Sequence, residues 1–227
     1  MPHAAGSRYG LPGDQCYYAL DLAGLRFLFL DLAYWAARDG QISPYLDKDL
    51  YDSGEIAGLG TSLQELDWLQ RELAAAGERP VVVVSHAPLG YKPNYPVVTL
   101  PRGKPPAGPR TSVAEMMGDV AGREAVRALL RQHPRVRLAL AGHWHISDFT
   151  REDGVAFCQT PALREFPFEF RLAIVEGERL HVTTHGLDDE SFRRQSYVEA
   201  WGNAWVAGTE TDRTFSVALQ PDLDLTA

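Results

Sequence analysis

The stretch Val81-Val82-Val83-Val84-Ser85-His86-Ala87-Pro88 decides the fold. A run of four β-branched residues between polar ones predicts a central strand that is buried on both faces, as in a parallel sheet. A second apolar run, residues 136–141, ends in Gly142-His143-Trp144-His145. A helical pattern precedes each run, so the sequence predicts an α/β fold.

The first of these helices is expected over residues 63–76. Ser62 and Glu65 form a capping box at its start, and Gly77 follows as a stop. Four leucines would share its buried face: Leu63, Leu66, Leu69 and Leu73. The second helix is expected over residues 122–132, directly before the second buried strand.

The rest of the chain reads mainly as strands and loops. We expect a hairpin of residues 17–22 and 25–31, loops over 34–60 and 89–110, and strands at 155–160, 170–176 and 180–184. The 89–110 loop is rich in proline and glycine and is typical of a functional lid. Tyr197, Trp201 and Trp205 are spaced by four residues, which favours an amphipathic helix in the tail.

Composition narrows the class of function. The chain has 227 residues and a formal net charge of −8, so a general nucleic-acid or anionic-membrane surface is not expected. Its two widely spaced cysteines, Cys16 and Cys158, indicate reduced core thiols rather than a disulfide framework. The first residues lack a basic region followed by an apolar run, and no apolar stretch approaches the ~20 residues of a membrane span. We therefore expect a cytoplasmic protein.

His86, His143 and His145 are the candidate metal ligands. Each follows the carboxyl end of a predicted buried strand, where open α/β sheets bind ligands. On an extended segment, His143 and His145 would project from the same face, because the period of a strand is two residues. A lone histidine is more often structural, but two such sites on neighbouring strands favour metal ligation.

The same residues carry a family resemblance. The segments Val84-Ser85-His86-Ala87-Pro88 and Ala141-Gly142-His143-Trp144-His145 resemble the two histidine motifs of the calcineurin-like metallophosphoesterases. The likeness covers about residues 10–186. It implies a β-sandwich with flanking helices and a dinuclear site in which His86 and His143 bind one metal and His145 the other. The metal-activated water would then attack a phosphoric ester.

The chain departs from this family at its N-terminal side. The D-x-H and G-N-H motifs are absent, and the only early Gly-Asp, Gly13-Asp14, lies directly before the strand at Tyr17, too late to be the G-D motif. The resemblance therefore implies a domain over residues 1–187 that is truncated at its N-terminus, followed by a C-terminal extension over 188–227. The missing strands would leave an exposed sheet edge, and a homo-oligomer could cover it. Asp31 and Asp148 are candidate substitute carboxylates, although solvated positions are expected for both. Arg164 is expected to pair with Glu165 rather than with phosphate.

The expected function is metal-dependent hydrolysis of a small phosphorylated substrate, either a phosphodiester or a small phosphomonoester. Nitrogen and oxygen ligands suit one or two ions of Mn, Fe, Zn or Co. Three histidines and water are themselves a valid mononuclear site. The alternative is a catalytically impaired remnant that acts as a metal-binding or protein-interaction module. Neither the catalytic nor the substrate-binding residues are assigned by the sequence.

Overall fold

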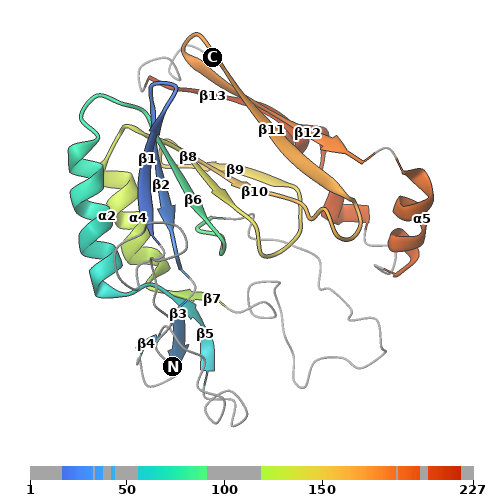
Figure 1. The fold of residues 1–227 in the computed structure, drawn as a ribbon, viewed down its shortest axis with the longest axis horizontal. Coiled ribbons are helices and arrows are strands. Elements are labelled where there is room, and N and C mark those ends of the chain that lie inside the picture. The colour runs from blue at the N-terminus through green and yellow to red at the C-terminus, as the bar shows by residue number, and fades with distance from the viewer. Residues whose placement is uncertain are drawn as a thin grey trace, which may run out of the picture.

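The structure is a computed structural model of the chain. It describes residues 17–32, 34–37, 42–43, 56–90, 119–187, 189–199 and 204–220. These residues form a six-stranded sheet packed against a three-stranded sheet, a third sheet of four short strands, four helices and one 3₁₀ turn (Figure 1).

The larger sheet has six strands and contains both histidine-bearing strands. Its spatial order is β1 (Tyr18–Leu22), β2 (Leu25–Leu30), β6 (Val81–Ser85), β8 (Val136–Ala141), β10 (Val155–Gln159) and β9 (Asp148–Glu152). The four central strands run parallel, with β1 and β9 antiparallel at the two edges. The hairpin and both buried strands therefore form as the sequence predicts.

Two helices cover one face of this sheet, α2 (Leu63–Ala75) and α4 (Arg123–Gln132) (Figure 1). Leu69, Leu73, Val126 and Leu130 pack with the apolar side chains of β2, β6 and β8 in one core cluster. The Ser62 hydroxyl accepts the Glu65 backbone N–H at 3.1 Å, which confirms the predicted start of α2. The predicted buried face is wrong at Leu63, which is 79% exposed, because the core contacts begin one turn later.

Glu65 is a buried carboxylate rather than an exposed capping residue. Its side chain is 1% exposed. It accepts the Asp31 backbone N–H at 2.7 Å and the Thr61 hydroxyl at 2.9 Å. Burial raises the pKa of Glu65, and these hydrogen bonds offset only part of that effect. Glu65 thus ties the start of α2 to the carboxyl end of β2.

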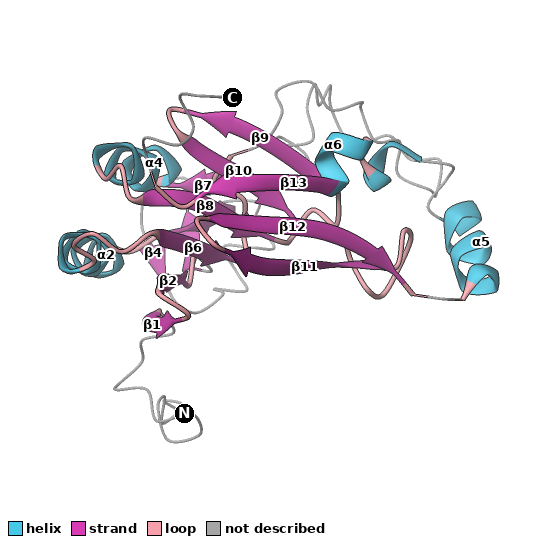
Figure 2. Cartoon of the chain, turned by 90° about the horizontal axis from the view of Figure 1, so that it is seen from above, coloured by secondary structure: helices cyan, strands magenta, loops and turns pink. Residues whose placement is uncertain are grey.

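The second sheet lies against the other face of the large one. Its order is β11 (Glu169–Glu176), β12 (Arg179–Gly186) and β13 (Thr214–Ala218), all antiparallel. Leu180, Val182 and Val217 meet Val82 and Leu138 of the large sheet in a second core cluster. Helices, large sheet and small sheet thus form layers (Figure 2), which is the sandwich with flanking helices that the sequence predicts.

The expectation of a loop over residues 34–60 is wrong. The chain forms β3 (Tyr34–Ala37), β4 (Ile42–Ser43) and β5 (Ile56–Gly60), which join β7 (Asp119–Ala121) in a four-stranded sheet of order β4-β3-β5-β7. These strands are only two to five residues long and gain their pairing through tertiary contacts, so they lack the periodicity that marks a strand in a sequence. Most of the predicted 89–110 loop lies outside the described residues.

The tail forms several short elements. Helix α5 (Glu190–Glu199) is followed by the 3₁₀ turn η1 (Ala204–Ala207), α6 (Glu210–Arg213) and β13. Tyr197 lies in α5 and Trp205 in η1, whereas Trp201 lies outside the described residues. In the described part of the chain, no helix is long and apolar enough to cross a membrane. The expected division near residue 187 stays a prediction.

Candidate metal site

The candidate site lies where the parallel strands end. Ser85 of β6 is in register with Ala141 of β8, and Ala141 with Gln159 of β10, so the loops after these strands leave the sheet side by side. The Gly142 N–H donates to the His86 carbonyl oxygen at 3.1 Å, which links two of these loops. The sequence prediction that His86 comes from a neighbouring strand is therefore confirmed.

His86 and His143 meet directly. The Nδ1 atom of His143 lies 2.9 Å from the Nε2 atom of His86, and the two rings meet nearly edge to face. Metal–imidazole bonds of about 2.0–2.1 Å at a right angle place the two nitrogens about 2.9 Å apart, whereas a tetrahedral angle requires about 3.4 Å. The observed pair therefore fits two neighbouring ligands of one six-coordinate ion, and it equally fits a direct imidazole–imidazole hydrogen bond.

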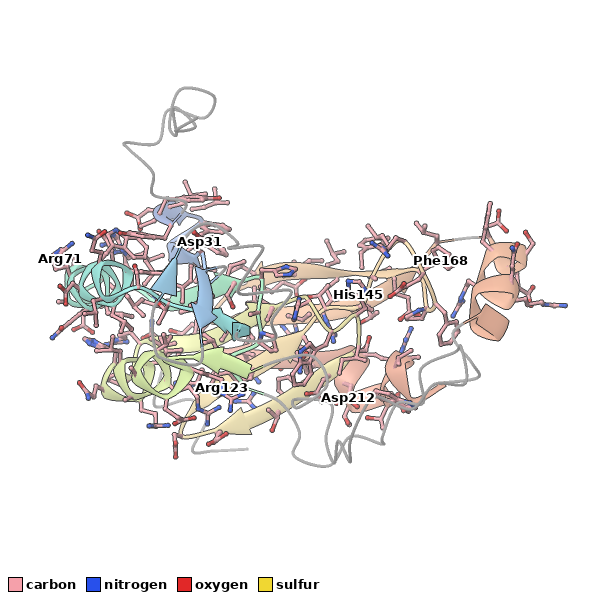
Figure 3. All side chains as sticks on the ribbon, turned by 90° about the horizontal axis from the view of Figure 1, so that it is seen from below. Asp31, Arg71, Arg123, His145, Phe168 and Asp212 are labelled. Atoms are coloured by element: carbon pink, nitrogen blue, oxygen red, sulfur yellow. The ribbon has the colours of Figure 1, made fainter. Side chains whose placement is uncertain are left out.

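His145 has a different partner. Its Nδ1 atom lies 2.5 Å from Oε1 of Glu165, a residue of the loop between β10 and β11. Figure 3 shows His145 between Asp31, on the α2 side, and Phe168, on the α5 side. Within the described residues, no group of three or more His, Cys, Asp or Glu side chains converges closely enough to hold one ion.

The expected extended conformation of the His143–His145 segment is wrong. His143 and His145 have φ angles of 67° and 56°, so both adopt the left-handed conformation that non-glycine residues seldom take. The Trp144 N–H donates to the Gly142 carbonyl at 2.8 Å, and the Trp144 side chain is buried. A period of two therefore does not describe this turn, and the two imidazoles meet different neighbours.

Two C-terminal elements, η1 and α6, form hydrogen bonds to the segment that follows His145. The Ser147 N–H donates to the Val206 carbonyl at 2.8 Å, and the Phe149 N–H donates to Oδ1 of Asp212 at 3.1 Å. Asp212 also completes the capping box that begins α6. Residues of η1 and α6 thus fix the segment that directly follows His145.

The two candidate substitute carboxylates are less solvated than the sequence suggested. Asp31 directly follows Leu30, which is in register with Ser85, so Asp31 leaves the sheet beside the His86 loop. Its side chain is partly buried, and burial raises the pKa of Asp31. Asp148 is 2% exposed, and its Oδ2 lies 3.5 Å from the amide nitrogen of Gln159. The expectation of solvated positions is wrong for Asp148.

Glu165 is the site residue that sequence reasoning interpreted differently. The sequence predicts a pair with Arg164, and the Arg164 Nε atom lies 3.9 Å from Oε2 of Glu165, with the Arg164 side chain 80% exposed. The closer contact, however, is with His145. The position of Glu165 after β10, a parallel neighbour of β8, is the signal that could have indicated this contact.

Comparisons with known proteins identify the fold. No protein-family model matches the sequence, and no curated protein matches it. Among solved structures, a dimetal phosphatase from Danio rerio is similar with a TM-score of 0.52 and 19% sequence identity. The match covers 76% of this chain and 58% of that structure's chain. The chain therefore shares the fold of this structure and spans a little over half the length of its chain.

Proposed function

We propose that this protein is a metal-dependent hydrolase of phosphoric esters, acting on a phosphodiester or a small phosphomonoester. The observation that carries the proposal is the 2.9 Å approach of His143 Nδ1 to His86 Nε2 at the carboxyl ends of parallel strands. The fold is shared with a protein described as a dimetal phosphatase, which supports the same class of reaction.

His86 and His143 would hold one divalent ion, and His145 would serve a second position. When bound, such an ion supplies Lewis acidity, which makes water nucleophilic near neutral pH and offsets charge on the phosphoryl oxygens. The imidazole donors suit Mn, Fe, Zn or Co.

The proposal is tested by metal content and turnover in the same preparations. The chain is loaded with Mn, Zn or Co and assayed with bis-p-nitrophenyl phosphate and p-nitrophenyl phosphate. We expect His143→Ala to lose both bound metal and turnover. The matched control is His181→Ala, because His181 is a partly exposed histidine of β12 whose ion pair with Glu176, among the described residues, is a distant one at 3.9 Å.

A second candidate function is metal binding without catalysis. It is favoured because the described residues bring together two histidines rather than three or more ligands. This candidate predicts bound metal that depends on His143 and no turnover with either ester. A wild-type chain that neither binds metal nor hydrolyses either ester contradicts both candidates.

A further inference from the structure

The loop between β10 and β11 places the Glu165 carboxylate beside the turn of residues 142–145. The Thr160 N–H donates to the Ala141 carbonyl at 2.7 Å, so the chain leaves β10 directly beside the end of β8. The loop then closes on itself, since the Phe168 N–H donates to the Glu165 carbonyl at 2.7 Å and the Glu169 N–H to the Ala162 carbonyl at 3.1 Å. These bonds fix the backbone at the residue that contacts His145.

The contact between Glu165 and His145 determines which ring nitrogen of His145 can bind a metal ion. Glu165 Oε1 lies 2.5 Å from Nδ1 of His145, and a carboxylate oxygen can only accept a hydrogen bond. Nδ1 must therefore carry the proton. In the neutral imidazole this leaves Nε2 unprotonated, with its lone pair directed away from Glu165.

We propose that Glu165 is a positioning residue that holds His145 in the Nδ1–H tautomer and presents its Nε2 atom to a divalent cation. This inference rests on the proposed function, because it gives His145 its role as a metal ligand. A carboxylate that accepts the second ring N–H of a ligating histidine fixes the ring and increases the basicity of the ligating nitrogen.

A purely structural ion pair would have different consequences. The His145 and Glu165 side chains are 36% and 43% exposed, and pairs this exposed contribute only about 0–1 kcal/mol to the free energy of unfolding. Loss of a carboxylate behind a metal-ligating histidine, in contrast, weakens metal binding by about 10–100-fold. Stability and metal affinity therefore separate the two roles.

The experiment compares Glu165→Ala, Glu165→Gln and the control Arg164→Ala in the full chain. Zn(II) and Co(II) affinities are measured by titration, and urea unfolding reports stability. The ¹⁵N shifts of the His145 ring are recorded in metal-free protein and assigned by their loss in His145→Ala. Arg164→Ala is matched because it removes the neighbouring exposed charge and leaves the contact with His145 in place.

We expect Glu165→Ala to weaken metal binding by about 10–100-fold, with unfolding nearly unchanged and with a mixture of His145 tautomers. Glu165→Gln should restore most of the affinity, because its amide oxygen still accepts the Nδ1 proton. Arg164→Ala should change none of these readouts.

Two results would overturn the inference. One is an unchanged metal affinity in Glu165→Ala when the wild-type chain does bind metal. The other is a His145 ring in metal-free wild-type protein whose Nδ1 is unprotonated. Failure of the proposed function looks different: the wild-type chain binds no metal, while the tautomer measurement still reports on the contact between Glu165 and His145.

Discussion

Arg213→Ala should destabilise this protein strongly, although the Arg213 side chain is 29% exposed. Its partner Glu169 is 0% exposed, and the guanidinium holds both carboxylate oxygens, at 2.7 Å and 2.9 Å. Among the described residues, the cation that remains beside the buried Glu169 carboxylate after the substitution is the Nη2 atom of Arg193, at 3.5 Å. Breaking a buried pair from one side costs about 3–5 kcal/mol in the free energy of unfolding, because a charge stays buried without compensation.

For a chain of this size, that loss corresponds to a decrease of about 6–20 °C in Tm. Urea and thermal unfolding followed by circular dichroism measure it. Arg193→Ala is the matched control and should cost at most about 1 kcal/mol, since Arg193 is 41% exposed and more distant. The double variant Glu169→Met with Arg213→Met should recover most of the lost stability. A loss below about 1 kcal/mol in Arg213→Ala would refute the reasoning.

Three further outcomes follow from buried or exposed positions. Burial raises the pKa of Glu65 in the folded chain above its ordinary value of 4.5. Between 4.5 and the raised pKa, the folded chain binds more protons than the unfolded chain. The free energy of unfolding therefore falls as pH rises through this range. In urea titrations from pH 4 to 7, Glu65→Gln should reduce this slope. Burial raises the pKa of Cys158 to about 12, so in a Cys16→Ser background the native thiol should react with a disulfide reagent only after unfolding. The homo-oligomer expected to cover the edge left by the missing strands stays a prediction. Strand β11 is an edge strand of the small sheet and Leu172 in it is 43% exposed, so Leu172→Lys should reduce concentration-dependent sedimentation if two copies pair along this edge instead.

The elements that could be predicted are those that a local pattern of residues specifies. The unbroken valines of β6 and the apolar run of β8 could be placed because strands buried on both faces require such runs. The start of α2 could be placed because Ser62 caps it through the Glu65 N–H. The order of these elements also placed His86 beside the turn of His143, since parallel strand ends meet at one edge of a sheet.

What could not be predicted depends on contacts between distant segments. The Glu65 side chain looks like a surface capping residue until the N–H of Asp31, 34 positions away, becomes its partner. The left-handed backbone at His143 and His145 has only a weak signature in residue type, because histidine takes this conformation more often than most residues but far less readily than glycine. Glu165 reaches His145 only because β10 follows β8 in the sheet, although β9 lies between them in the sequence.

Strand order also explains why two histidines separated by one residue have two different partners. Strand β8 lies between β6 and β10, and adjacent strands are about 4.8 Å apart, so the turn after β8 has a neighbouring loop on each side. Trp144 is buried between the two histidines and anchors the turn. His143 then meets His86 of the β6 loop, and His145 meets Glu165 of the β10 loop. One turn thus places the rings of His143 and His145 at two separate positions. Under the proposed function, each of the two rings would serve its own ion.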